Sequence, residues 1–455
     1  MAKRRIGDGW VAFIVAVVVI LVVVGAGLLV PKIYPDETQY WEVGQTLLRT
    51  GSYSGFGSIL TAYKPPMMAW LSAGLLAAGI QMSAAKLMMS LFAGIVAALV
   101  FLGIRRLAPD RSPLVGAVGA LLVCANPAFV YTASTLYPQV ILAVLSLLMI
   151  WVLTLPVGGI GRRPTAEGLL LGLLIGLGML TSGDFAFGLL GAAIVAVFLW
   201  ITRHRSDRAA WRSALTLAAA MVLMAAIVLA PWVIRNNRDV HPGIYISTNS
   251  GDNLLRGNNE NAKVDSGPDV DLSAYFARIP PDTGEYERDQ LLRGFVFENW
   301  RSNPGYYARF YVEKLLFGLG NSTKTFTFGS MPMLDLILWA YYIPLWFGVL
   351  VWMWVAARRP DRLRSMFGHN ARRIADYGWI ALGAWVVNWA GHAVFFSRLR
   401  YRLPMDVALA PIAVFGFLII LSMVADRRAA RRGVAVGSTL SSQPEGTTSA
   451  NGSTS

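Results

Sequence analysis

Charge is scarce in this 455-residue chain: 15% of the residues are charged and 55% are hydrophobic. Soluble proteins average roughly 25% charged residues, so an ordinary soluble domain is excluded. Cysteine is nearly absent too, since Cys124 is the only one and lies in an apolar run. A disulfide framework and a cysteine metal site are therefore excluded. The four histidines are scattered, without the spacing typical of a zinc site.

Long apolar segments take the place of the missing charge. Several runs of about 18 or more apolar residues predict an all-α polytopic membrane protein with about ten transmembrane helices. The expected spans are 10–30, 83–104, 114–132, 136–156, 166–182, 185–201, 213–234, 331–356, 376–396 and 404–424. A shorter apolar stretch, 66–80, follows two prolines and predicts a juxtamembrane helix in the interface.

The net charge of +14 is concentrated at the ends of the apolar segments. Basic clusters begin at Lys3, Arg105, Arg162, Arg203, Arg358 and Arg427. This is the positive-inside pattern and not the basic stripe of a nucleic-acid interface, so no nucleic acid partner is expected. With Lys3 in the cytoplasm, alternation places both termini and every cluster inside. The run from Trp10 to Val30 exceeds a signal-peptide core of about 7–15 residues, so we expect a retained first span.

Two long loops are expected to face outward. The first, 31–66, carries acidic residues and a lysine, and the second, about 235–330, is rich in Asn, Gly and Ser. Within the second loop, Asp282 and Glu285 have capping-box spacing, and an amphipathic helix is expected after Pro304. The expected regions are an N-terminal transmembrane module (1–234), an extracytoplasmic loop region (235–330), C-terminal transmembrane helices (331–424) and a basic, then disordered cytoplasmic tail (425–455). The second loop is too short for a large catalytic domain, so chemistry is expected at the outer membrane surface.

Asp36 and Glu37 lie a few residues beyond the first span, where acidic residues are functional candidates. They are either a helix-start pair or a general base with an acceptor-binding acid. Lys64, ahead of two prolines, either snorkels among lipid phosphates or stabilises the phosphate of a lipid-linked sugar. Two adjacent acids without further ligands are a poor dedicated metal site. No cofactor is therefore indicated, although a divalent metal stays an open alternative.

Further candidates lie at other outward ends of the apolar segments. Arg400 and Arg402 belong to an arginine cluster that departs from the positive-inside pattern and suits bidentate phosphate contact. Arg235 is either a residue of the same kind or a helix-end anchor. Asp184, at an outer hairpin, is either a helix cap or a second active-site acid. His392, alone on an apolar helix, is interpreted as a hydrogen-bonded core residue.

Several motifs, in their order along the chain, resemble those of the GT-C superfamily of membrane glycosyltransferases. The relatives concerned are bacterial aminoarabinose transferases and protein O-mannosyltransferases. The matching segments are Asp36–Tyr40, Tyr63–Pro66, Ala230–Asn236, Ser247–Asn249, Gly257–Asn259 and Arg400–Pro404. The resemblance covers nearly the whole chain, to about residue 424.

The resemblance implies an integral membrane glycosyltransferase at the outer face of a bacterial inner membrane. It would transfer a sugar from a polyprenyl-phosphate donor to a lipid, glycan or protein acceptor, with inversion. Asp36 would be the base and Glu37 the acceptor-side acid, while Lys64 with Arg400 or Arg402 would stabilise the leaving phosphate. Substrate contacts are also expected from Tyr40, Tyr63, Asp184 and Arg235.

Two residues depart from the pattern of these relatives. Gln39 stands where aminoarabinose transferases have an arginine, and Gln139 stands where relatives often carry a second acid. A two-acid or metal-dependent mechanism would therefore require Asp184 as a substitute. The alternative from another class is a transporter or flippase of lipid-linked sugars. It predicts polar residues within the helical bundle, which are sparse apart from Asp184 and His392.

Overall fold

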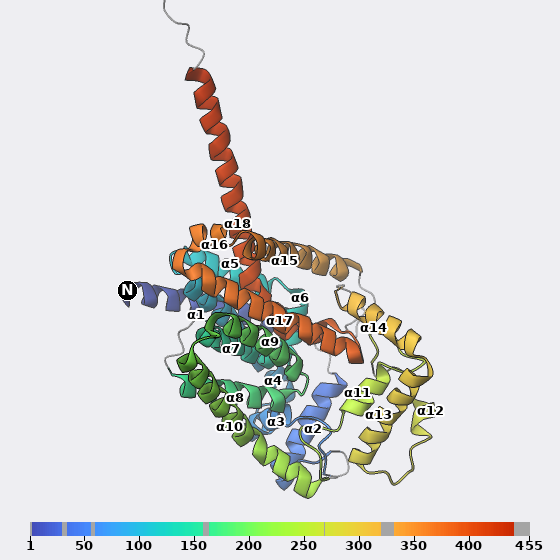
Figure 1. The fold of residues 1–455 in the computed structure, drawn as a ribbon. Coiled ribbons are helices and arrows are strands. Elements are labelled where there is room, and N and C mark those ends of the chain that lie inside the picture. The colour runs from blue at the N-terminus through green and yellow to red at the C-terminus, as the bar shows by residue number, and fades with distance from the viewer. Residues whose placement is uncertain are drawn as a thin grey trace, which may run out of the picture.

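The computed structural model describes residues 2–29, 34–55, 60–157, 163–267, 269–319 and 332–440. Helices dominate these ranges (Figure 1). The β-type pairing found within them is an isolated bridge between Ser54 and Leu60. The predicted all-α class is therefore confirmed.

A bundle of long apolar helices forms the main body of the protein. Its members are α1 (Ala2–Leu29), α4 (Met82–Leu107), α5 (Pro113–Cys124), α6 (Pro127–Ala133), α7 (Gln139–Val157), α8 (Pro164–Thr181), α9 (Phe185–His204), α10 (Arg208–Asp239), α15 (Pro332–Arg358), α17 (Ala371–Phe395) and α18 (Leu399–Leu440). Among the described residues, seven helices are long and apolar enough to cross a membrane, or eight if the bent pair α5–α6 is one span. The protein is thus a multi-pass membrane protein.

Each of the ten apolar segments expected as spans is mainly helical where it is described. Helices α7 and α17 are not among the seven candidate spans. The apolar stretch of α7 is shorter, and α17 carries the buried polar residues Asp376, Asn388 and His392. These polar residues interrupt the apolar surface of α17.

The segment expected as one span over 114–132 is broken into two helices that are bent by 71°. Pro127 cannot continue the hydrogen-bond ladder of α5, and Asn126 starts a new helix there. The Asn126 side chain accepts hydrogen bonds from the backbone N–H groups of Ala128 and Phe129, at 3.0 and 3.3 Å. This is N-terminal capping, and it explains the position of the bend.

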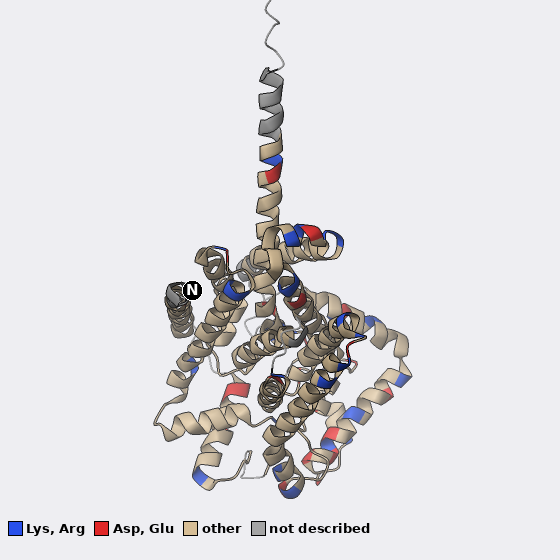
Figure 2. Cartoon of the chain, turned by 60° about the vertical axis from the view of Figure 1, so that its left-hand side comes forward, with Lys and Arg blue, Asp and Glu red and all other residues tan. Residues whose placement is uncertain are grey.

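Helices α8 and α10 pack along their lengths. Gly168 and Gly172 of α8 lie against the backbone of α10, where a Cβ at either position would collide with the carbonyl of Leu217 or Met221. Small residues at four-residue spacing allow this close approach between membrane helices. On the outward side of α10, large apolar residues such as Leu215 are exposed, which suits contact with lipid. Figure 2 shows charged residues mostly near helix ends and outside the bundle.

A second group of helices lies at one end of the bundle (Figure 1). It consists of α2 (Pro35–Thr50), α3 (Met67–Ala77), α11 (Ser250–Arg256), α12 (Ser273–Phe276), α13 (Glu285–Ser302) and α14 (Pro304–Leu319). Leu255, Tyr275, Phe295 and Val296 belong to a small core of its own. Helix α16 (Pro360–Phe367), with a 3₁₀ turn at Gly368–Asn370, lies at the opposite end of the bundle.

The helix expected after Pro304 is confirmed as α14, but the capping box expected at Asp282 is wrong. Helix α13 begins at Glu285 after Gly284, without a side-chain cap. The Glu285 carboxylate is instead engaged by the first loop, as described below. Helix α18 continues to Leu440, into the segment expected as a tail, and the remainder of that expected tail lies outside the described residues.

Candidate functional site

The site begins at the first turn of α2. Pro35 occupies the first helical position, where its missing N–H costs nothing, and Asp36 and Glu37 follow. Acidic side chains are favourable at a helix N-terminus because of the helix dipole. Consecutive residues of an α-helix point about 100° apart, so the two carboxylates face different surroundings.

Glu37 points into the protein and is fully buried. Its Oε1 accepts a hydrogen bond from the Leu136 N–H at 2.8 Å, and its Oε2 accepts one from the Tyr34 N–H at 2.8 Å. Lys86 of α4 lies 3.5 Å from the same carboxylate. Glu37 lines neither of the two cavities described below. This geometry supports an anchoring role, which holds α2 against α4 and the connection that precedes α7.

Asp36 points toward two cations from distant parts of the chain. Its carboxylate lies 2.6 Å from the Lys64 ammonium and 3.5 Å from the Arg400 guanidinium. Lys64 comes from the segment before α3, and Arg400 comes from the first turn of α18. The Asp36 side chain is 36% exposed, so a substrate can reach it. The structure thus brings together three of the predicted site residues.

Opposing influences act on the pKa of Asp36. Burial raises this pKa, but the positive charges of Lys64, Arg400 and Arg398 lower it by more than burial raises it. The pKa of Asp36 therefore lies below the ordinary range of a carboxyl group. Asp36 is therefore a carboxylate at neutral pH. Tyr63 behaves in the opposite way, because burial and the Asp252 carboxylate raise the pKa of its phenol well above the usual value. Tyr63 is thus a neutral hydrogen-bond donor.

Tyrosines surround Lys64. The Tyr40 ring lies with its centroid 4.5 Å from the Lys64 ammonium, a cation–π distance. The Tyr53 hydroxyl donates to the Lys64 carbonyl at 3.2 Å, and the Tyr63 hydroxyl donates to Asp252 at 2.9 Å. The side chains of Tyr40 and Tyr63 therefore lie beside the Asp36–Lys64 pair, where the sequence predicted substrate contacts.

Asp36 and its cations line a cavity of about 500 Å³ on the side of the bundle, which we call the bundle-side cavity. Its charged and titratable lining includes Asp36, Lys64, Asp184, Arg256, His392, Arg398 and Arg400. The apolar part of its lining includes Met179, Phe187, Ile246, Phe395 and Phe396. A cavity that combines several cations with apolar walls suits an anionic head group attached to an apolar chain.

Asp184 lies in the bundle-side cavity together with a residue that the sequence placed in the core. His392 lies 3.4 Å from the Asp184 carboxylate, and its ring stacks on Tyr401 with centroids 4.9 Å apart. Asp184 Oδ1 and Gln139 Oε1 are buried without a hydrogen-bond partner. Such groups indicate the place of an absent polar partner. The motif comparison singled out Gln139 as a departure from an acid, whereas His392 was interpreted as a core residue because nothing local in the sequence relates α17 to Asp184.

Two of the predicted arginines lie away from the cavity lining. Arg235 donates to the carbonyls of Thr61 and Tyr53, at 2.6 Å each, and thereby holds the first loop. Arg402 is buried and pairs with Asp406 of its own helix at 3.2 Å. In place of these arginines, Arg398 lines the cavity. The sequence could have predicted Arg398 as a site residue, because it belongs to the same arginine cluster as Arg400 and Arg402.

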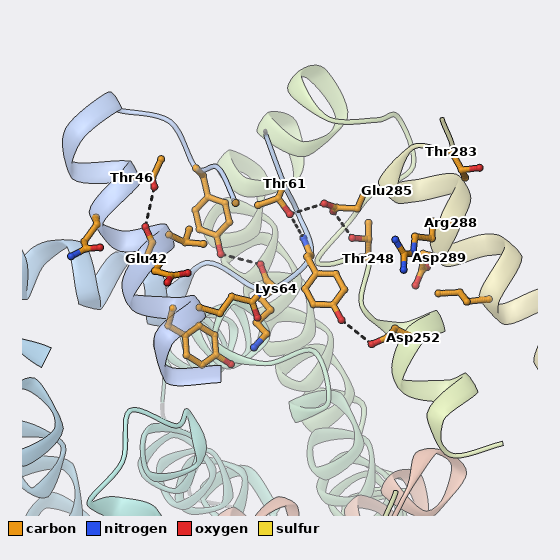
Figure 3. A pocket seen from close by; sticks show the side chains of 18 of the residues that line it. Glu42, Thr46, Thr61, Lys64, Thr248, Asp252, Thr283, Glu285, Arg288 and Asp289 are labelled. Atoms are coloured by element: carbon orange, nitrogen blue, oxygen red, sulfur yellow. Dashed lines mark hydrogen bonds between the residues drawn. The ribbon is translucent and has the colours of Figure 1, made fainter. Parts of the chain in front are cut away.

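A second, larger cavity of about 1050 Å³ lies between α2 and α13, and we call it the loop-side cavity (Figure 3). Glu285 ties its two walls together, because it accepts hydrogen bonds from Thr61 Oγ1 at 2.6 Å and from the Ala62 N–H at 2.9 Å. The Thr248 hydroxyl also donates to Glu285. The two cavities share the residues Gln39, Tyr40, Tyr63, Lys64, Asp252 and Arg256. The Asp36–Lys64 pair therefore lies at their junction.

The side chains around Asp36 are a poor match to a metal site. Among the described residues, no group of three or more His, Cys, Asp or Glu side chains is arranged to hold a metal ion. Near Asp36 the charged neighbours are cations, which disfavour a bound metal ion by repulsion.

Comparisons with known proteins support the resemblance stated from the motifs. Residues 63–234 match the family model described as dolichyl-phosphate-mannose-protein mannosyltransferase. No curated protein matches the sequence. The fold is similar to a crystal structure of ArnT from Cupriavidus metallidurans bound to undecaprenyl phosphate, with 16% identity, 85% of this chain and 77% of that chain covered, and a TM-score of 0.43. The apo form of the same protein gives 18% identity, 86% and 78% coverage, and a TM-score of 0.36. The match over residues 63–234 agrees with the resemblance to membrane glycosyltransferases predicted from the motifs.

Proposed function

We propose that the protein transfers a sugar from a polyprenyl-phosphate-linked donor to a hydroxyl acceptor, at the outer face of a bacterial inner membrane. The observation that carries this proposal is the position of Asp36, an accessible carboxylate between Lys64 and Arg400 at the junction of two cavities. The family match supports the reaction class.

The bundle-side cavity would hold the donor. Lys64, Arg398 and Arg400 provide positive charge for a phosphate, and arginine can contact two phosphate oxygens at once. Met179 and Phe187 offer apolar surface to the beginning of a prenyl chain. The related ArnT structure contains undecaprenyl phosphate, a lipid of this chemistry.

The transfer would proceed by a single displacement with inversion. Asp36 removes the proton from the acceptor hydroxyl as its oxygen attacks the anomeric carbon. The bond from that carbon to the donor phosphate breaks, and its electron pair passes to the phosphate oxygen. Lys64 and Arg400 stabilise the charge that develops there. Donor binding also activates the base, because a phosphate that attracts Lys64 and Arg400 frees the oxygens of Asp36.

The remaining polar groups of the cavity suit the donor sugar. Asp184 Oδ1 and Gln139 Oε1, both buried without partners, are acceptors for sugar hydroxyls. His392 holds the orientation of Asp184. Glu37, Arg235 and Arg402 would support the site from outside the cavities, through the contacts described above.

The orientation proposed here follows the basic clusters. Both termini and α16 would be cytoplasmic, and α2 with α11–α14 would lie on the outer side. The regions 1–234, 235–330 and 331–424 would then be a transmembrane module with the catalytic first loop, an outer loop region and a second transmembrane part. Figure 1 places α16 at the end of the bundle opposite α2 and α13, as this orientation requires.

The test compares a deletion strain with its parent by mass spectrometry of lipid-linked sugars and of envelope glycans. We expect one sugar linkage to disappear from the envelope while its polyprenyl-phosphate precursor accumulates on the outer face. Expression of the wild-type chain should restore the linkage, and the Asp36→Asn variant should not. A flippase would instead leave the precursor on the inner face, and the Asp36→Asn variant would restore the linkage, which would contradict the proposal.

A further inference from the structure

Glu42 is an acidic residue of α2 that the proposed reaction does not use. It lines the loop-side cavity together with Thr46 and other residues of α2 (Figure 3). Its Oε2 is buried and has no hydrogen-bond partner. A buried carboxylate oxygen without a partner is costly, and in a native structure it calls for an explanation.

The other acids of the same cavity are already engaged. Asp252 accepts the Tyr63 hydroxyl and pairs with Arg256 at 3.0 Å, Asp289 pairs with Arg293 at 2.6 Å, and Glu285 holds the two walls together. Glu42 is thus the carboxylate of this cavity that is left to bind a ligand. Its missing partner must be a hydrogen-bond donor, because an ionised carboxylate only accepts.

The composition of the loop-side cavity restricts the kind of ligand. Its apolar side chains, apart from tyrosines, are Val43, Phe276 and Leu292. The rest of the lining consists mainly of Gln, Thr, Arg, Asp and Glu side chains. On these polar side chains a polyhydroxylated ligand can exchange its water hydrogen bonds for protein ones. The cavity therefore suits a glycan.

The connection between the cavities restricts the position of that glycan. Tyr40 and Tyr63 belong to both cavities and lie beside Lys64. Sugar rings present an apolar C–H face that packs on aromatic rings and an edge of hydroxyl groups. A glycan end that rests on these tyrosines would bring one hydroxyl to Asp36, while Glu42 binds a hydroxyl further along the chain.

We infer that the loop-side cavity binds the end of an envelope polysaccharide as the acceptor, and that Glu42 is its acceptor-side acid. This inference rests on the proposed function and adds the acceptor class to it. The family resemblance implied that Glu37 is the acceptor-side acid. Because the Glu37 carboxylate is buried and engaged, we assign that role to Glu42 instead.

The test uses the deletion strain complemented with the wild-type chain, Glu42→Gln, Glu42→Asp or Glu298→Gln. Glu298 is an exposed acid of α13 that lies outside both cavities, so its variant is the matched control. Each envelope is separated into extractable lipid, protein and delipidated polysaccharide, and the sugar linkages of each fraction are quantified by mass spectrometry.

We expect the deletion to remove a terminal sugar from the polysaccharide fraction. The wild type and Glu298→Gln should restore it, and Glu42→Asp should restore it in part. With Glu42→Gln, the amount of terminal sugar should be at least about tenfold below that of the wild type, as expected for a lost hydrogen bond to a charged group. Purified Glu42→Gln should melt at the wild-type temperature or above, because Glu42 Oε2 has no partner to lose.

Two results would overturn the inference while leaving the proposed function intact. One is a sugar that disappears from the lipid or protein fraction and not from the polysaccharide. The other is full restoration by Glu42→Gln. A deletion strain unchanged in every fraction would instead contradict the proposed function itself.

Discussion

Substitution of Asp36 by Asn separates the catalytic role of this residue from a structural one. Asn is nearly isosteric, and its side-chain oxygen can still accept a hydrogen bond from Lys64, which lies 2.6 Å away. The Asp36 side chain is 36% exposed, so the lost ion pair with Lys64 is screened by solvent. We therefore expect a stability loss of about 1 kcal/mol or less.

The expected effect of Asp36→Asn on transfer is much larger. Asn cannot take a proton from the acceptor hydroxyl, and general-base assistance is worth about 10²–10⁴-fold in rate. Because the pKa of Asp36 is held below its usual range, the wild-type rate should not fall between pH 7 and pH 5 through protonation of this group. The variant should be slow over the same range.

The assay uses both proteins purified in detergent and a mixture of polyprenyl-phosphate sugars and envelope glycans extracted from the deletion strain. Polyprenyl phosphate released over time is measured by mass spectrometry, and melting temperatures are recorded in parallel. Near-normal release by Asp36→Asn, at an unchanged melting temperature, would refute the assignment of the base. A large fall in melting temperature would show that the Asp36–Lys64 pair is chiefly structural.

Three further predictions concern lysines and the second acid of α2. Lys64→Ala should raise the donor concentration needed for half-maximal release, and Lys64→Arg should recover part of the loss because it keeps the charge with a different reach; unchanged donor dependence would contradict phosphate binding. Glu37→Gln should destabilise the protein by about 3 kcal/mol, since it removes a buried charge partner of Lys86, and a wild-type melting temperature would refute this anchoring role. Burial lowers the pKa of Lys314 to about 7, so the unfolded chain binds more protons than the folded one above pH 7. Compared with Lys314→Met, the wild type should therefore gain stability from pH 7 to pH 9 and change little between pH 5 and pH 7, as measured by melting temperature; a constant difference across the range would contradict it.

The helices of this protein follow from its sequence because their causes are local. Apolar runs longer than a bilayer is thick can satisfy their backbone only as helices when they cross it. Local capping also marks some boundaries, since Asn126 and Asp207 each accept hydrogen bonds from the backbone N–H groups of the helix that follows. The number of spans does not follow from local causes alone, because α17 carries buried polar residues whose partners lie on other helices.

The candidate site was predictable where chemistry at a membrane boundary makes a residue unusual. Asp36, Lys64 and Arg400 stand out as charges at the ends of apolar segments, and the structure places Lys64 and Arg400 within 3.5 Å of Asp36. Asp184 was predicted on the same ground and lines the same cavity. In each case the sequence determined which residue was available, and the packing of the helices brought it to the same cavity.

Only the tertiary structure decided what the other charged residues do. Glu37 is adjacent to Asp36, yet one faces the protein and the other faces the cavity, because a helix turns neighbours about 100° apart and packing selects the buried side. Glu285 has the spacing of a helix cap, but it binds the first loop, more than 200 residues earlier in the chain. Glu42 and His392 acquire their surroundings from elements that are equally distant in sequence. A single sequence shows the hydrophobic periodicity and the polarity of each segment. The partner of a side chain depends on contacts between distant segments, and such contacts leave no local pattern in the sequence.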